Sequence, residues 1–216
     1  MPAMEPIVIV DYGAGNLRSV QKAFEHLGHA AAIADDPDTV AKAPAIVFPG
    51  QGACPPAMAT LNRHGMADAL RQAVRSGTPF FGVCLGLQLL FDWSEEGDMP
   101  GLGIIPGRVV RLPRGPRVPH MGWNEVRLAR SHPVFEGVPD ESLFYFVHSY
   151  HAVPSRPESV VATTDHGIAF CSVAARDNVI ATQFHPEKSG PLGLRLYDNF
   201  VRCVVSSPRG GTRVSH

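Results

Sequence analysis

The feature that most constrains the fold of this chain is an alternation, in its first half, of short apolar runs with segments of helical periodicity. Apolar runs occupy residues 7–10, 45–48 and 79–83. Between them, apolar residues recur at helical spacing over residues 17–27 and 65–76. Strands that are apolar throughout and alternate with helices are typical of a parallel sheet covered on both faces. The sequence therefore predicts an α/β fold with a doubly wound, mostly parallel sheet flanked by helices, and functional residues at the carboxyl ends of its strands.

The second half of the chain has a different pattern, because β-rich runs follow one another without helices between them. These runs cover residues 108–112, 125–128, 142–147, 159–164 and 168–173. They predict a smaller antiparallel or mixed sheet. A last helix is expected after Ser189, since Pro191 suits the first turn of a helix. No linker or repeat divides the chain, so we expect one domain over residues 1–206 and a polar, frayed tail at 207–216.

Composition argues against several classes of protein. With 19 Lys and Arg against 20 Asp and Glu, the net charge of -1 gives no reason to expect a nucleic-acid partner. The longest uncharged stretch, residues 43–62, contains four prolines and cannot be a membrane helix. The N-terminus lacks the positive charge of a secretory leader, so we expect a cytoplasmic protein with no membrane partner.

Cysteine and histidine spacing gives no sign of a disulfide framework or a metal site. The four cysteines show no C-x-x-C spacing, which indicates free thiols. His148 and His151 lie three residues apart, but side chains three apart in a strand face opposite ways, and no carboxylate pair completes a set of ligands. We therefore expect neither a metal nor a cofactor.

The most informative segment is 79–90, where an apolar strand is expected to run directly into a leucine-rich helix. Cys84 lies at the junction, with Gly82 and Gly86 two residues away on each side. This is the G-x-C-x-G form of a nucleophile elbow, in which a sharp, strained turn exposes the sulfur above the strand ends. The positive end of the helix also favours a thiolate. We identify Cys84 as the candidate nucleophile and interpret the other three cysteines as structural.

A thiol nucleophile needs a base, and the base needs a group that orients it. A β-rich run at 179–184 leads to His185 and Glu187, separated by one proline. If the chain stays extended there, both side chains point to the same side, so the carboxylate can accept the Nδ1 proton and leave Nε2 facing the thiol. The order Cys84, His185, Glu187 differs from the order nucleophile, acid, histidine of α/β-hydrolases, which disfavours esterase chemistry. On its own, a His-Pro-Glu segment is equally well explained as a surface turn.

Attack on a carbonyl also requires hydrogen-bond donors for the oxyanion. The backbone N–H of Leu85 directly follows the candidate nucleophile, and the turn Gly50, Gln51, Gly52 ends another expected strand. These groups are candidate donors. Taken alone, the turn is equally well explained as a simple strand exit.

At these motifs the chain resembles the class I (triad) glutamine amidotransferases over nearly its whole length. Segment 82–88 (Gly-Val-Cys-Leu-Gly-Leu-Gln) is similar to their elbow, and segment 183–189 (Gln-Phe-His-Pro-Glu-Lys-Ser) to their His/Glu strand end. The resemblance implies that Cys84 attacks the side-chain amide of glutamine, while His185 transfers the proton and Glu187 orients His185. The residues implied to bind glutamine are Gly50, Gln51, Gly52, Leu85, Gln88, Ser149 and Tyr150.

More narrowly, the chain is similar to members of this family that serve histidine biosynthesis. Segments 11–16 (Asp-Tyr-Gly-Ala-Gly-Asn), 119–124 (Pro-His-Met-Gly-Trp-Asn) and 145–150 (Tyr-Phe-Val-His-Ser-Tyr) carry this similarity. It implies a heterodimer with a (β/α)8 cyclase subunit that receives the ammonia. The residues implied at the partner interface, or in signalling between the sites, are Asn16, Pro119, His120, Met121, Gly122, Trp123, Asn124, Tyr145, His148 and Lys188. Trp123 and Met121 are candidate anchors because they are large and apolar, with ordinary core positions as the alternative.

Where many members of the family have a small apolar residue and an aromatic residue, this chain has Gln51 and Cys54. Two other functions remain open. One delivers ammonia to a different acceptor, as in the synthesis of anthranilate, purines or pyridoxal, although segment 119–124 argues against it. The other is a non-catalytic thiol protein on the same fold, which gives no reason for Cys84, His185 and Glu187 to occur together.

Overall fold

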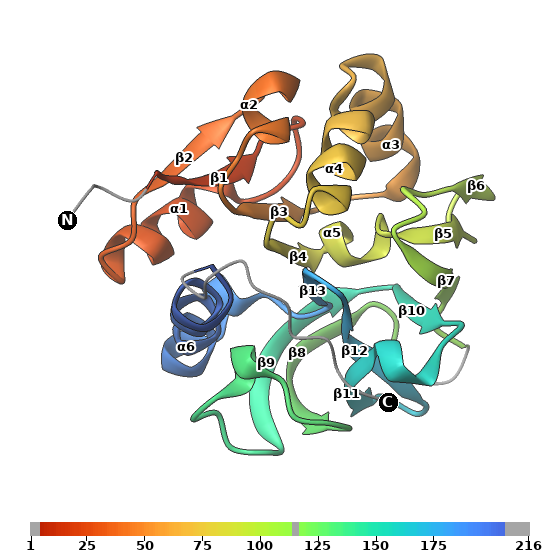
Figure 1. The fold of residues 1–216 in the computed structure, drawn as a ribbon. Helices are drawn as coiled ribbons and strands as arrows, with labels where there is room; N and C mark the ends of the chain where they lie inside the picture. The colour runs from red at the N-terminus through yellow and green to blue at the C-terminus, as the bar shows by residue number, and fades with distance from the viewer. Residues whose placement is uncertain (1–4, 114–116, 206–216) are drawn as a thin grey trace.

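The computed structural model describes residues 5–113 and 117–205, which build a large sheet with helices on both faces (Figure 1). The strands in this part of the chain are β1 (Ile7–Val10), β2 (Ala31–Ala34), β3 (Ile46–Gly50), β4 (Phe80–Cys84), β5 (Phe91–Ser94), β6 (Met99–Pro100), β7 (Ile105–Arg111), β8 (His120–Leu128), β9 (Ser142–His148), β10 (Tyr150–Pro154), β11 (Val160–Asp165), β12 (Ala169–Arg176) and β13 (Val179–Thr182). The helices are α1 (Leu17–His26), α2 (Pro37–Ala41), α3 (Cys54–Arg63), α4 (Met66–Arg75), α5 (Leu85–Gln88) and α6 (Gly190–Asn199). Short 3-10 helices lie at Pro133–Phe135, Pro157–Ser159 and Pro186–Lys188, and a π-helical segment at Phe200–Val205 follows α6.

The sheet has a parallel half and a largely antiparallel half. Its main path runs β2-β1-β3-β4-β13-β12-β10-β7-β5-β6, and β8, β9 and β11 branch from it through β12. The pairs from β2 to β13 are parallel, whereas β12 pairs with β13, β10 and β11 in antiparallel register. The predicted fold class is therefore confirmed, and the antiparallel strands continue the same sheet.

Alternate residues of the apolar strands bury on opposite faces, which explains why helices cover both sides. Val8 and Val10 belong to the core beneath α3 and α4, and Ile7 and Ile9 to the core beneath α1 and α6. All four side chains are buried. In Figure 1, α3 and α4 lie above the parallel strands and α1 and α6 below them.

The helix after Cys84 is much shorter than the leucine pattern suggests. The sequence indicates a helix through residue 90, but α5 ends at Gln88 and the chain enters β5 at Phe91. The physical reason is burial on all sides. Leu87, Leu89 and Leu90 are all buried, so the leucines fill the core on either side of the turn instead of marking one face of a long helix.

Close packing at two glycines holds α5 against the sheet. A Cβ atom at Gly86 would collide with the carbonyl oxygen of Phe48 in β3. A Cβ atom at Gly82 would lie 2.8 Å from that of Ala181 in β13. Gly86 therefore allows contact with the backbone of β3, and Gly82 leaves room for the Ala181 side chain of β13.

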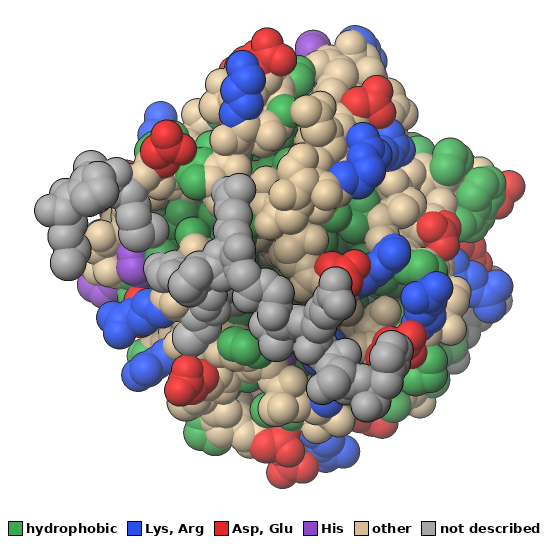
Figure 2. Space-filling view, viewed as in Figure 1, with side chains coloured by type: hydrophobic (Ala, Val, Ile, Leu, Met, Phe, Trp, Pro, Cys, Tyr) green, Lys and Arg blue, Asp and Glu red, His purple; other side chains and the backbone are tan. Residues whose placement is uncertain are grey.

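The face shown in Figure 2 carries charges of both signs among neutral residues, in keeping with the net charge of -1. Within residues 5–113 and 117–205, no helix has the length and apolar character needed to cross a membrane.

We predict that Gly86→Ala destabilises the fold by at least about 2 kcal/mol, because a backbone carbonyl cannot yield as a flexible side chain can. Urea unfolding followed by circular dichroism measures the loss. The control is Gln72→Ala on the exposed side of α4, which should change stability by less than about 0.5 kcal/mol. A Gly86→Ala variant as stable as the parent chain would contradict this account of the packing.

Candidate active site

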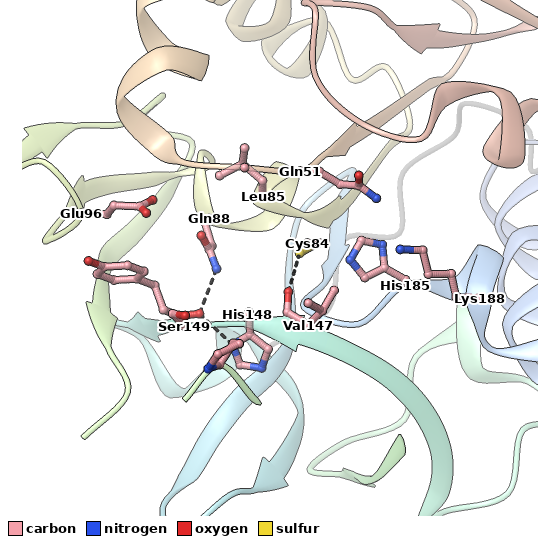
Figure 3. Close-up of a pocket in the computed structure, with 13 residues that line it drawn as sticks. Gln51, Cys84, Leu85, Gln88, Glu96, Val147, His148, Ser149, His185 and Lys188 are labelled. Carbon is pink, nitrogen blue, oxygen red and sulfur yellow. Dashed lines mark hydrogen bonds between the residues drawn. The ribbon is translucent and has the colours of Figure 1, made fainter. Parts of the chain in front are cut away.

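The carboxyl ends of three neighbouring parallel strands bring the predicted triad together. Gly50, the last residue of β3, is in register with Cys84, the last residue of β4. On the other side of β4, Val83 pairs with Thr182, three residues before His185. Cys84 and His185 therefore lie side by side although a hundred residues separate them, as the close-up shows (Figure 3).

The backbone at Cys84 has the predicted sharp, strained conformation. Its φ of 54° and ψ of -106° are unusual for a residue with a side chain, and Cys84 is the residue that precedes α5. Although only 6% of Cys84 is exposed, the residue lines a cavity of about 380 Å³. The sulfur is thus buried in the protein yet faces a space that a small molecule can enter.

The contact between His185 and Glu187 is present, but the chain makes it differently from the sequence-based expectation. Nδ1 of His185 lies 2.8 Å from Oε1 of Glu187, and both side chains are buried. The prediction of an extended segment is wrong, because Pro186–Lys188 forms a 3-10 turn. Proline suits the first position of such a turn, which brings the carboxylate back toward the imidazole. The hydroxyl of Tyr197 donates to the other oxygen of Glu187 at 3.4 Å.

The electrostatic setting of His185 favours its protonated form. Burial alone would lower the His185 pKa, but its interactions with Cys84 and then Glu187 outweigh burial and raise the pKa to about 10. Nε2 of His185 has no hydrogen-bond partner among the described residues. This nitrogen is therefore free to take the proton of the Cys84 thiol, and the resulting imidazolium is stabilised by Glu187.

Two other groups contact the sulfur of Cys84. The thiol donates to the carbonyl oxygen of Val147 at 3.8 Å, and Nε2 of Gln183 donates to the sulfur at 3.7 Å. Gln183 is fully buried, and its Oε1 accepts from Nε2 of Gln88 at 3.2 Å. Sequence reasoning gave Gln183 no role. The available signal was a long polar side chain at the end of an otherwise apolar strand.

Most of the predicted glutamine-binding residues line the same cavity. Those that do are Gln51, Gly52, Leu85, Gln88, Ser149 and Tyr150. Gly50 is not among them, since it lies beneath the turn, paired with Cys84. Three residues predicted at the partner interface also line it: Pro119, His148 and Lys188. Glu96 and Val147 complete the lining and were not predicted, because no local pattern marks them.

The amide of Gln88 is oriented by the protein itself. Nε2 donates to the carbonyl oxygen of Tyr150 at 2.9 Å, and among the described residues Oε1 has only the Cys54 thiol as donor, at 4.0 Å. The same Tyr150 carbonyl accepts from Nδ1 of His148 at 2.8 Å. The oxygen of Gln88 therefore remains able to accept a hydrogen bond from a cationic group in the cavity.

The other predicted interface residues divide between β8, β9 and α1. Met121 and Trp123 are 62% and 55% exposed, which rules out ordinary core positions for them. Trp123 packs against Tyr145, and Nζ of Lys188 lies 5.9 Å from the Tyr145 ring. His120 is buried and contacts both His148 and Asn124. Gly122 lies between Met121 and Trp123 on β8. Asn16 lies apart from these residues, at the start of α1.

The remaining thiols differ from Cys84 in their surroundings. Burial raises the pKa of Cys54 to about 12 and that of Cys171 to about 12, which suits the structural interpretation. The side chain of Cys203 and the predicted tail at 207–216 lie outside the described residues. Throughout the part of the chain that is described, no three His, Cys, Asp or Glu side chains form a group that could hold a metal ion.

A strained cysteine, an unpartnered imidazole nitrogen and a buried carboxylate beside a polar cavity are the parts of an enzyme that attacks a carbonyl through sulfur. The sequence profile of the glutamine amidotransferase class-I family matches residues 8–203. The chain therefore belongs to that family.

Two relatives illustrate how similar the chain is to named members of the family. The imidazole glycerol phosphate synthase subunit HisH of Moorella thermoacetica is 48% identical over 209 residues, which cover 96% of this chain and 100% of that protein. The subunit of the same name from Syntrophotalea carbinolica is 52% identical over 202 residues, covering 90% of this chain and 98% of that one.

Solved structures share the fold at lower identity. PurLQS from Thermotoga maritima superposes with a TM-score of 0.71 at 17% identity, covering 92% of this chain and 98% of that one. A crystal structure of a glutamine amidotransferase superposes with a TM-score of 0.69 at 23% identity, covering 90% and 96%. At these identities the comparison shows the fold alone.

We predict that Glu187→Gln slows alkylation of Cys84 by iodoacetamide at least about fivefold near neutral pH. Without the carboxylate the His185 pKa falls, so the imidazolium that stabilises the thiolate is less populated there. Above about pH 10 an ordinary thiol is ionised without help, and both proteins should react alike. The rate is measured as a function of pH by mass spectrometry of the labelled chain.

The matched control for that experiment is Glu158→Gln, at an exposed position far along the chain from the triad. It should leave the pH profile unchanged. Equal alkylation rates for Glu187→Gln and the parent chain at neutral pH would show that Glu187 does not support the ion pair.

Proposed function

We propose that this chain is the glutaminase subunit of an imidazole glycerol phosphate synthase, which hydrolyses glutamine and passes the ammonia to a (β/α)8 cyclase subunit in histidine biosynthesis. The observation that carries the proposal is that Cys84 and His185 line one cavity while Glu187 contacts the Nδ1 side of His185. The names of the relatives at 48% and 52% identity support the particular synthase.

The first half of the reaction uses the sulfur and the imidazole. Cys84 transfers its proton to Nε2 of His185, and the thiolate attacks the side-chain carbonyl carbon of glutamine. The negative charge moves to the carbonyl oxygen, where the Leu85 N–H and an N–H of the turn Gly50 to Gly52 are the candidate donors. His185 then gives its proton to the leaving nitrogen, which departs as ammonia and leaves a thioester on Cys84.

The second half of the reaction releases glutamate. Water attacks the thioester carbonyl, and His185 accepts a proton from that water. Collapse of the intermediate breaks the bond between carbon and sulfur and frees glutamate, and the proton on His185 passes to the departing sulfur, which restores the thiol. The buried contact with Glu187 keeps the Nδ1 side of His185 occupied throughout, so Nε2 is the nitrogen that exchanges protons in both halves.

The far end of the cavity suits the amino-acid head of glutamine. A free amino acid presents an ammonium and a carboxylate, and each needs a polar partner. Oε1 of Gln88 and the carboxylate of Glu96 are acceptors for the ammonium, and both line the cavity. Ser149, between β9 and β10, and Tyr150, the first residue of β10, also line the cavity and supply further polar groups.

An apolar strip on β8 and β9 supports a protein partner beside the cavity. Met121 pairs with Val147 and Trp123 pairs with Tyr145 in the ladder between these strands. Leu143, two residues before Tyr145, is also exposed. The strip adjoins the cavity, because Val147, which pairs with Met121, and Lys188, which lies near the Tyr145 ring, both line that cavity. Ammonia would leave the cavity on this side. A covered exit keeps ammonia from being protonated in water, which would destroy its nucleophilicity.

Three further predictions concern the whole chain. A single domain over residues 1–206 is supported by the family match over residues 8–203. A heterodimer with the cyclase is supported by the name "subunit" given to the relatives. A cytoplasmic location stays a prediction from the sequence. All three stay part of the proposal.

We expect Cys84→Ala to abolish glutamine hydrolysis while the fold and partner binding persist, because the sulfur is the attacking atom. The measurement follows glutamine labelled with ¹⁵N in its side-chain amide, incubated with this chain, a co-purified cyclase subunit and the nucleotide substrate. The parent chain should transfer the label into product, and the variant should not.

Cys171→Ala is the matched control, since Cys171 is a buried thiol that does not line the cavity and donates to the Val173 carbonyl. It should retain transfer of the label. Undiminished turnover by Cys84→Ala would remove the mechanism, and label found in free ammonia but in no cyclase product would point to a different acceptor.

We expect Trp123→Ala to weaken binding of the cyclase subunit by more than ~1 kcal/mol, as loss of a large apolar anchor does. Isothermal titration calorimetry measures the affinity. The control is Trp93→Ala on β5, a tryptophan 41% exposed on a strand distant from β8 in the sheet order. Unchanged affinity for Trp123→Ala, or an equal loss for Trp93→Ala, would contradict the assignment of the strip as the docking surface.

A further inference from the structure

Tyr12 carries a buried hydroxyl that lacks a hydrogen-bond partner. Its oxygen has no contact with solvent, and none of the described residues accepts or donates a hydrogen bond to it. The ring is held in place by Phe48, with ring centroids 5.2 Å apart. Burial, with Cys84 and Cys54 nearby, raises the pKa of Tyr12 far above its usual value, so the hydroxyl keeps its proton. It is therefore a fixed donor without an acceptor.

This hydroxyl lies against the turn that offers oxyanion donors. A Cβ atom at Gly50 would collide with the Tyr12 oxygen. Gly15, in the same β1–α1 connection as Tyr12, would place a Cβ atom 3.5 Å from the backbone of Gly50. Gly50 thus provides the space that the hydroxyl occupies. Gly50 is buried on the interior side of the turn, whereas Gln51 and Gly52 line the cavity.

The geometry of a peptide unit connects the two sides of this turn. The peptide between Gly50 and Gln51 is planar, and its C=O and N–H point in opposite directions. When the Gln51 N–H faces a carbonyl oxygen in the cavity, the Gly50 carbonyl must face the interior. A buried carbonyl without a donor is unfavourable, and so is a buried hydroxyl without an acceptor. In that orientation each group would satisfy the other.

We propose that Tyr12 is a positioning residue for the oxyanion turn, whose hydroxyl donates to the Gly50 carbonyl oxygen and so stabilises the orientation that turns the Gln51 N–H toward the substrate. In the present structure this hydrogen bond is not made, since the hydroxyl has no partner among the described residues. The inference rests on the proposed glutaminase function.

The test is Tyr12→Phe, which removes the oxygen and keeps the ring on Phe48. The kcat for glutamine hydrolysis should fall about five- to a hundredfold, the range expected when a buried carbonyl loses its donor. The KM for glutamine should stay within about twofold, because Tyr12 does not line the cavity. Alkylation of Cys84 by iodoacetamide, which needs the thiolate but no oxyanion donor, should also be unchanged. The melting temperature should stay the same or rise, since an unpartnered polar atom is lost.

Thr164→Val is the matched control, because Thr164 in β11 carries another buried hydroxyl without a partner among the described residues. It should leave kcat unchanged. Kinetics are measured for the chain alone and in its complex with the cyclase subunit. An unchanged kcat for Tyr12→Phe, an equal fall for Thr164→Val, or a parallel fall in the alkylation rate would overturn the proposal. A parent chain without glutaminase activity would overturn the proposed function instead, so the two failures are distinguishable.

Discussion

The structure depends on the close approach of backbone to backbone at the ends of β3 and β4. Gly86 lies against the carbonyl of Phe48, and Gly50 is in register with Cys84. This contact leaves no room for side chains on the inner side of the elbow, so the Cys84 side chain must project toward the cavity. The strained φ of Cys84 is the local consequence, and it is maintained because the packed strands and helix on either side leave the turn no relaxed alternative.

The second requirement is that the buried side chain of His185 can carry a positive charge. An imidazolium at His185 would be unfavourable in isolation, because burial disfavours the charged form. The carboxylate of Glu187 offsets this cost, since its Oε1 lies 2.8 Å from Nδ1 of His185, and the Tyr197 hydroxyl donates to the same carboxylate. The backbone is fixed as well, since the Ser189 hydroxyl donates to the His185 carbonyl at 2.6 Å. A short turn therefore combines an electrostatic partner with a rigid support.

The sequence predicted those parts of the site that local rules determine. Glycines two residues on each side of Cys84 predicted the elbow, and the apolar runs predicted the parallel strands that align it with His185. The contact between His185 and Glu187 was predicted for an extended segment, whereas the chain forms a 3-10 turn there. The sequence could not distinguish the two, because a single proline between His185 and Glu187 is compatible with both conformations. Glu96 and Tyr12 could not be predicted, since only the packing of distant segments brings them to the cavity or the turn.

Neutral histidines fix the direction of a hydrogen-bond chain between the apolar strip and the cavity. Burial lowers the pKa of His120 to about 4 and that of His148 to about 3, so each ring has one donor and one acceptor. Nδ1 of His148 must donate to the Tyr150 carbonyl, which leaves its Nε2 to accept from Nδ1 of His120 at 2.9 Å. His120 can then only accept from Asn124, at 3.1 Å. The tautomers of both rings are thus set by one backbone carbonyl, the same carbonyl that orients Gln88, and a second proton on either ring would break the chain.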